Sequence, residues 1–214
     1  MNRRQDVIDA AVAILQESGP DALTTVAVAA RLGVTQSAIY RHVRNIDELA
    51  TLASRQVVAA MQERLRVAIV GSDIEWGGPG ITRKFSDLIV SLMATDAKPF
   101  EIIDRWRYAD GALGLGIRDI LRQGNDFCCA ILESEWRKRY GYSKRFTPSL
   151  QTVLETYGGL IQDDVIRVAR LVSDGGYPGG RAAIARILEL RMLGGYMAYS
   201  SDMNRRLGLP VVIN

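Results

Sequence analysis

The 214-residue sequence contains one histidine and two cysteines, which limits the chemistry that its side chains can perform. A Ser-His-Asp or Cys-His catalytic system would have to be built around His42, because the chain has no second histidine. Cys128 and Cys129 are adjacent, a spacing that strains a disulfide and does not match the C-x-x-C pattern of metal or redox sites. We therefore expect no enzyme activity, no metal site and no cofactor. The cysteines are interpreted as small apolar residues of a helix, with a thiol sensor as the alternative.

His42 lies in a stretch whose charges favour contact with a polyanion. From Ala22 to Ile46 the sequence has no aspartate or glutamate. Acids here would repel DNA phosphates, which carry roughly one charge per 1.7 Å of duplex. The net charge of the chain is only +3, so its distribution is more informative than its total. The fixed positive charges of the stretch are Arg31, Arg41 and Arg44.

Apolar residues recur with helical periodicity along nearly the whole chain, and no segment alternates as a strand would. We expect an all-α protein of about nine helices. Residues 1–46 are predicted to form a three-helix head with a helix-turn-helix, and residues 47–214 a larger helical bundle for ligand binding and dimerisation. The second and third helices are too short to persist alone, so they need the first and fourth as packing surfaces.

Local signals place the ends of the helices in the head. Thr24 and Thr35 are suited to cap the second and third helices, because a hydroxyl oxygen accepts a bond from an early N–H. Gly33 stands where a glycine ends a helix at little cost. Asn45, with Glu48 three residues later, is a capping pair for a long fourth helix. The third helix is predicted to carry its apolar side chains inward and its short or hydrogen-bonding ones outward, toward the major groove of DNA.

The segment Leu23 to Leu49, LTTVAVAARLGVTQSAIYRHVRNIDEL, resembles the DNA-binding head of the tetracycline-repressor (TetR) family. The resemblance rests on the paired threonines, Ala29, the Leu-Gly-Val turn, the Tyr-x-His-Val sequence and the following asparagine. With the first helix it covers about a fifth of the chain. Val26 and Ile46 depart from the founding member of the family, which has basic residues there, so we expect a different operator.

The resemblance implies roles for residues of the head. Thr24 and Thr25 would bind phosphates through hydroxyl groups and the helix N-terminus. The beginning of the recognition helix would face base edges, where glutamine suits adenine and alanine suits the thymine methyl group. Arg41 would bind guanine or a phosphate, and Arg44 a phosphate. The predicted DNA-binding residues are Thr24, Thr25, Thr35, Gln36, Ser37, Ala38, Tyr40, Arg41, His42 and Arg44.

Each of these residues also has a purely structural interpretation. Tyr40 would pack its ring and leave its hydroxyl in water, and His42 would be a satisfied residue near a helix end. Arg41 and Arg44 would be solvated charges. The motif as a whole is a stronger indication than any one of its members.

One small head makes too few contacts for specific DNA binding, so a two-fold dimer is expected. Small residues in the last helix let two backbones approach, whereas glycine inside a helix otherwise costs about 1 kcal/mol. By resemblance to the family, the last two helices form the interface, and the alternative is a crossing within one chain. The predicted interface residues are Gly194, Gly195 and Ala198.

The resemblance also implies a pocket for a small-molecule ligand in the bundle. Aromatic and soft apolar residues at helical spacing are the candidates, with ordinary core packing as the alternative for each. Trp106 lies between Arg105 and Arg107, with Asp110 nearby, which suits an anionic or amphipathic ligand. The candidate ligand-binding residues are Phe85, Met93, Trp106, Phe127 and Tyr157.

Three further stretches have simpler interpretations. Gly71 to Gly80 is predicted to be a loop. Gly111 to Gly116 is predicted to be a flexible joint before a long helix and not a nucleotide-binding loop, since no strand precedes it and no G-K-[ST] follows. The basic run from Arg137 to Arg139, followed by Lys144 and Arg145, suits a solvated helix end, with a second nucleic-acid patch as the alternative.

The expected function is that of a cytoplasmic, dimeric repressor that a small-molecule inducer releases from double-stranded operator DNA. No membrane partner is expected, because the apolar runs are shorter than the ~18–20 residues needed to cross a bilayer. An enzyme that uses carboxylates and lysine is the second class considered. A third is an adaptor whose head binds protein, and salt-insensitive partner binding would favour it.

Overall fold

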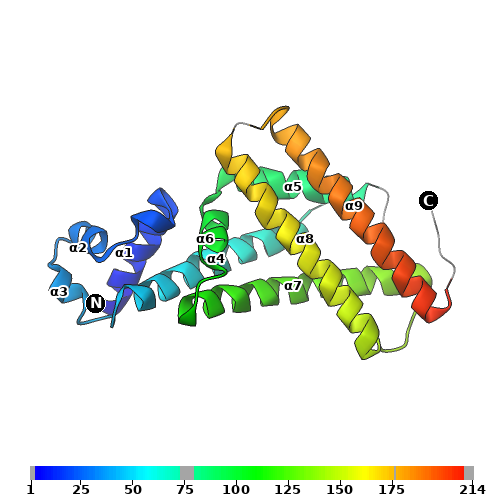
Figure 1. Ribbon diagram of the computed structural model, residues 1–214, viewed down its shortest axis with the longest axis horizontal. Coiled ribbons are helices and arrows are strands. Elements are labelled where there is room, and N and C mark those ends of the chain that lie inside the picture. Colours follow the sequence, from blue (N-terminus) through cyan, green and yellow to red (C-terminus); the bar gives the residue numbers. More distant parts are fainter. Residues whose placement is uncertain (1–2, 73–79, 176, 210–214) are drawn as a thin grey trace. The chain divides into compact units, whose positions relative to one another are not determined.

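The computed structural model describes residues 3–72, 80–175 and 177–209, and in these residues all regular structure is helical. The predicted all-α fold with about nine helices is confirmed (Figure 1). The helices are α1 (Arg3–Ser18), the short 3₁₀ helix η1 (Pro20–Ala22), α2 (Thr25–Leu32), α3 (Gln36–Ile39), α4 (Ile46–Val70), α5 (Ile81–Thr95), α6 (Lys98–Trp106), α7 (Gly111–Tyr140), α8 (Pro148–Asp174) and α9 (Gly180–Leu207). Most of the predicted 71–80 loop lies outside the described residues.

The helices form two compact units. The first comprises Met1–Val67 and Asp96–Arg122, and the second comprises Ala68–Thr95 and Gln123–Asn214. The long helices α4 and α7 each contribute residues to both units. The predicted boundary between a DNA-binding and a ligand-binding domain, after residue 46, does not coincide with the division into these two units. It stays a prediction.

Three helix ends in the first unit follow the predicted local signals. The Oγ1 of Thr24 accepts a hydrogen bond from the backbone N–H of Ala27 at 3.1 Å and so caps α2. Gly33 ends α2 with a φ of 64°, in the left-handed region that favours glycine. The Oδ1 of Asn45 accepts from the N–H of Glu48 at 2.8 Å at the beginning of α4. These three predictions are confirmed.

Helix α3 is shorter than the sequence pattern indicates. The predicted helix continued to Val43, but regular α-helix ends at Ile39 and the chain continues in turns. The N–H groups of both His42 and Val43 donate to the carbonyl of Ile39, at 2.9 and 3.2 Å. Thr35 precedes the helix without a capping bond, because its hydroxyl lies 2.9 Å from the hydroxyl of Ser37. A single helical turn has too few internal bonds to persist alone, so its neighbours must hold it.

Gly111 to Gly116 was predicted to form a joint before a long helix. In the structure these residues form the first turns of that helix, α7. A side chain at Gly114 would collide with the backbone carbonyl of Ala109, and one at Gly116 would press on the side chain of Arg55. These two glycines therefore permit close packing inside the first unit. The expectation of a flexible joint was wrong, because composition alone does not distinguish a hinge from a tight contact.

The core of the second unit lies among α5, α8 and α9, which pack against one another (Figure 1). The rings of Tyr157 and Tyr199 stack with centroids 5.0 Å apart, and the hydroxyl of Tyr157 donates to the carbonyl of Met192 at 3.0 Å. Arg191 of α9 and Asp164 of α8 form an ion pair of 2.6 Å. The apolar and aromatic contacts of three helices thus hold this unit together.

Candidate DNA-binding surface

The beginning of α2 presents hydroxyl groups at the surface of the head. Thr24 is exposed and Thr25 is half-buried. The Oγ1 of Thr24 accepts the capping bond, which leaves its hydroxyl hydrogen able to donate to an external acceptor. Val26, the next residue, is 59% exposed. This position therefore offers an apolar side chain where the founding member of the family has a basic one. The geometry suits contact with a phosphate oxygen beside an uncharged surface.

The single turn of α3 separates an exposed side from a buried side. Gln36 and Ser37 are exposed and Ala38 is half-buried, whereas Ile39 is completely buried and Val43 is 2% exposed. Helix α3 packs against α2, and α2 packs against α1. Burial of Ile39 and Val43 therefore fixes the direction in which the polar side chains point.

The turn between α3 and α4 carries the remaining predicted residues. Tyr40 is 48% exposed, which does not fit a ring packed into the core. Arg41 and Arg44 are exposed and His42 is half-buried. All of these residues belong to the first unit, together with Thr24 and Gln36.

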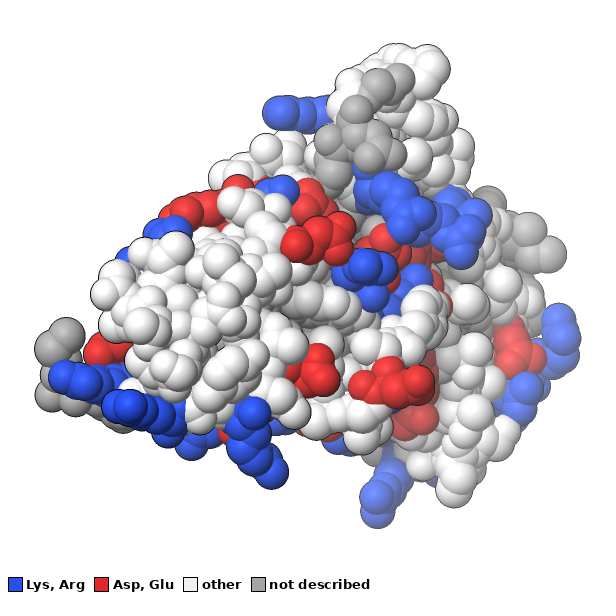
Figure 2. Space-filling model, turned by 60° about the vertical axis from the view of Figure 1, so that its left-hand side comes forward, with Lys and Arg blue, Asp and Glu red and all other residues white. Residues whose placement is uncertain are grey.

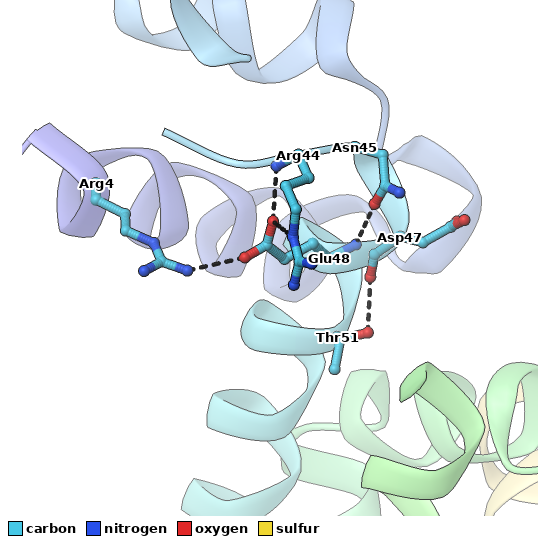
Figure 3. Close-up of polar contacts among 6 residues, drawn as sticks. All are labelled: Arg4, Arg44, Asn45, Asp47, Glu48 and Thr51. Carbon is cyan, nitrogen blue, oxygen red and sulfur yellow. Dashed lines mark hydrogen bonds and ion pairs between the residues drawn. The ribbon is translucent and has the colours of Figure 1, made fainter. Parts of the chain in front are cut away.

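The carboxylate of Glu48 joins three parts of the head (Figure 3). Its Oε2 accepts from the backbone N–H of Arg44 at 2.6 Å and lies 3.4 Å from the Nε of the same residue. Its Oε1 accepts from Nη2 of Arg4, on α1, at 2.9 Å. The capping pair of Asn45 and Glu48 was visible in the sequence, but the contact with Arg4 was not, because 44 residues separate the two.

The hydrogen bond from the Arg44 backbone is the main cause that lowers the pKa of Glu48 below its usual range, and the nearby Arg44 and Arg4 charges lower it further. The carboxylate is therefore ionised at neutral pH. Arg31, one of the three positive charges of the acid-free stretch, makes two bonds to Glu17 of α1, at 2.6 and 2.7 Å. Its charge is neutralised locally.

Lysine and arginine side chains do not form a continuous positive surface on this protein. Figure 2 shows lysines and arginines separated by acidic and uncharged areas on the visible face. Residues 1–50 contain five Arg or Lys and six Asp or Glu. The electrostatic case for DNA binding thus depends on the acid-free segment from Ala22 to Ile46 and not on the total charge of the head.

The predicted ligand-binding residues are distributed over both units. Phe85 and Met93 of α5 and Tyr157 of α8 are buried in the second unit, and Phe127 of α7 is half-buried there. Trp106 belongs to the first unit and is half-buried.

Burial raises the pKa of Cys128 to about 11 and that of Cys129 to about 12. Both thiols are therefore protonated at neutral pH, which makes them poor nucleophiles and favours their interpretation as apolar residues. Among the described residues, no group of three or more His, Cys, Asp or Glu side chains is placed to hold a metal ion.

The head is thus a helix-turn-helix domain, and comparison with known proteins identifies its family. Residues 7–52 match the bacterial regulatory proteins of the tetR family. The tetracycline repressor protein class D of Escherichia coli is 41% identical over 56 residues, which are 26% of this chain and 26% of that protein. The similarity to these curated relatives therefore spans about a quarter of their length. The N-terminal part of the chain is therefore a DNA-binding domain of the tetR family of bacterial regulatory proteins.

Solved structures extend the likeness in fold to nearly the whole chain. A transcriptional regulator from Rhodococcus sp. Rha1 has a TM-score of 0.64 and 18% identity, over 91% of this chain and 96% of that one. The transcriptional regulator FadR from Bacillus subtilis, in complex with stearoyl-CoA, has a TM-score of 0.60 and 18% identity, over 89% and 98% of the two chains. At such identities the likeness shows a shared fold. None of the described helices has the length and apolar character to cross a membrane.

The Glu48 contacts predict a specific loss of stability in acid. A lowered pKa in the folded state means that ionised Glu48 stabilises the head above its ordinary pKa of about 4.3, and that this stabilisation is lost as the pH falls through the lowered value. In Glu48→Gln the urea midpoint should be lower at pH 7 and should fall less between pH 5 and pH 3 than in the wild type. Glu17→Gln removes another carboxylate whose pKa is lowered, by its hydrogen bonds with Arg31, and should show the same pattern. A Glu48→Gln profile parallel to the wild type would contradict the assignment.

Proposed function

We propose that this protein is a dimeric transcriptional repressor that binds operator DNA in the cytoplasm and is released by a small-molecule inducer. One observation carries the proposal: α3 exposes Gln36 and Ser37 on a turn anchored by the buried Ile39. Uncharged hydrogen-bonding side chains on a rigid, acid-free element suit the edges of base pairs in the major groove.

The exposed positions of the head support separate roles. Gln36, Ser37 and Ala38 would face bases, while Thr24, Thr25 and Thr35 would bind phosphates. Tyr40 and His42 would contact the sugar-phosphate backbone of the DNA and so fix the position of the protein on it. Arg41 would bind guanine or a phosphate, and Arg44 a phosphate. The exposure of Tyr40 and Arg41 supports these roles.

An uncovered apolar surface of the second unit supports the dimer. On α9, Leu190, Leu193 and Met197 are 51%, 40% and 43% exposed, and Leu160 of α8 is 58% exposed. Large apolar side chains grouped on one face mark an interaction surface, and a C2 dimer would bury the same face on both copies. Gly194 and Ala198 are exposed on the same stretch of α9.

Gly194 and Gly195 differ in what surrounds them. A side chain at Gly194 would enter open space, whereas a Cβ at Gly195 would lie 2.8 Å from the ring of Tyr157. Gly195 is therefore needed for the contact between α8 and α9 within one chain, and the interface proposal depends on Gly194 and Ala198.

The ligand proposal rests on the aromatic residues and on the relative from Bacillus subtilis, which was solved with stearoyl-CoA. An anionic, amphipathic molecule of this class would match the half-buried Trp106, beside Arg105 and Arg107. Phe127 is the half-buried candidate of the second unit, and Phe85, Met93 and Tyr157 would line a site only from within the core.

Binding to DNA from upstream of the protein's own gene tests the regulator. Gln36→Ala and Arg41→Ala should each weaken binding by ~1–3 kcal/mol and reduce discrimination against altered base pairs, if the two side chains contact bases. Fluorescence anisotropy at several salt concentrations measures both effects. Arg181→Ala, which removes an exposed arginine of α9, is the control and should bind as the wild type does. An equal loss on every sequence would instead make Gln36 and Arg41 phosphate contacts.

The dimer surface predicts that Gly194→Leu is folded but monomeric. Leucine favours a helix by up to about 1 kcal/mol over glycine and meets no atom within the chain, but overpacks an interface by about 1–3 kcal/mol. Sedimentation velocity should show the shift, while thermal unfolding should show an intact fold. Ala130→Leu, at an exposed position of α7, is the matched control. If Gly194→Leu stays dimeric, this face is not the interface.

Stearoyl-CoA is the first probe for the ligand site. If Trp106 borders the site, stearoyl-CoA should quench tryptophan fluorescence more than coenzyme A does, and the quench should be smaller in Trp106→Phe. The same concentration should release the wild type from DNA. An identical quench in both proteins would remove Trp106 from the site.

A further inference from the structure

We propose that Arg4, at the beginning of α1, binds a DNA phosphate together with Arg44, and that Glu48 is the positioning residue for both guanidinium groups. The sequence analysis assigned no role to Arg4, which precedes the segment matched to the family. The inference rests on the proposed DNA-binding function of the head.

The two arginines meet at one carboxylate from different elements. Figure 3 shows Arg4 approaching Glu48 from α1, and Arg44 from the turn before α4. The Oε1 of Glu48 binds Arg4 Nη2 at 2.9 Å, while Oε2 binds the backbone N–H of Arg44 and lies 3.4 Å from its Nε. Because the oxygens of one carboxylate are close together, the two guanidinium groups are near neighbours.

The carboxylate is shielded, whereas the guanidinium groups remain accessible. The side chain of Glu48 is 19% exposed, but those of Arg4 and Arg44 are 52% and 87% exposed. Each guanidinium has five N–H donors, and the contacts with Glu48 use only one on each. Both arginines therefore retain donors for a phosphate oxygen.

The charges of the three residues leave a surplus of one positive charge. Two guanidinium groups alone would repel each other, and the carboxylate between them offsets that repulsion. Glu48 is itself fixed, because its backbone N–H is bound by Asn45 and its carboxylate by the donors described above. An acid so close to a DNA-binding surface thus has a constructive role: it holds two arginines that would otherwise move independently.

The pair of Arg31 and Glu17 shows a different arrangement. There one guanidinium makes two bonds to one carboxylate, so no charge is left over. Arg31 lies near the end of α2, about two helical turns from Thr24, which caps its beginning. This ion pair between α1 and α2 is therefore a matched control for the loss of an arginine–carboxylate contact in the head.

The test measures binding to the upstream DNA and to an unrelated duplex across a range of salt concentrations. Each phosphate contact contributes about 0.9 to the slope of log K against log salt for duplex DNA. In Arg4→Ala the slope should become shallower by about that amount, and affinity should fall by the same factor on both duplexes. Arg31→Ala should leave the slope unchanged. Circular dichroism at the binding temperature checks that each variant is folded.

Glu48→Gln separates positioning from simple repulsion. If Glu48 positions the arginines, removal of its charge should weaken DNA binding and make the slope shallower, although a negative charge has been removed. Tighter binding with an unchanged slope would show that Glu48 only repels phosphates, and would overturn its positioning role. An unchanged slope in Arg4→Ala, with the wild type binding normally, would overturn the inference but not the proposed function. If the wild type binds neither duplex, both fail.

Discussion

The burial of Ile39 and Val43 is the constraint on which the candidate DNA-binding surface depends. Helix α3 has one turn, and such a segment has too few internal hydrogen bonds to stay helical alone. Ile39 is completely buried and Val43 nearly so, and α3 packs against α2, which packs against α1. The free energy that orders the recognition element thus comes from apolar burial. Gln36 and Ser37 can face outward because Ile39 faces inward.

Charge acts on this surface through its placement. The acid-free segment places no carboxylate on α3, while Arg31 is neutralised by Glu17. Glu48 lies just beyond the segment and contacts two arginines without exposing much of its own side chain. A head with balanced total charge can therefore still present local positive charge, because the geometry of each ion pair decides what remains available.

The second unit uses α9 in two ways. One face of the helix carries buried residues such as Leu188 and Met203, and Gly195 allows Tyr157 to approach. The other face exposes Leu190, Leu193 and Met197 around Gly194. Adjacent glycines thus have different surroundings, because successive helical residues point about 100° apart.

Features that depend on a few neighbouring residues could be predicted from the sequence. These are the all-α fold, the Thr24 cap, the end of α2 at Gly33 and the beginning of α4 at Asn45. Caps and turns join atoms three or four residues apart, so their pattern is visible in a short stretch of sequence. The motif from Leu23 to Leu49 also indicated the family for the same reason, since it is continuous.

Contacts between residues far apart in the sequence became visible only in the folded chain. The tertiary structure shortened α3 to one turn, placed Gly111 to Gly116 inside α7, and directed Gly195 toward Tyr157. It also brought Arg4 to Glu48 and Arg31 to Glu17, contacts that no periodicity encodes. Such contacts depend on how helices pack, because each is made across a gap in sequence that only the folded chain closes.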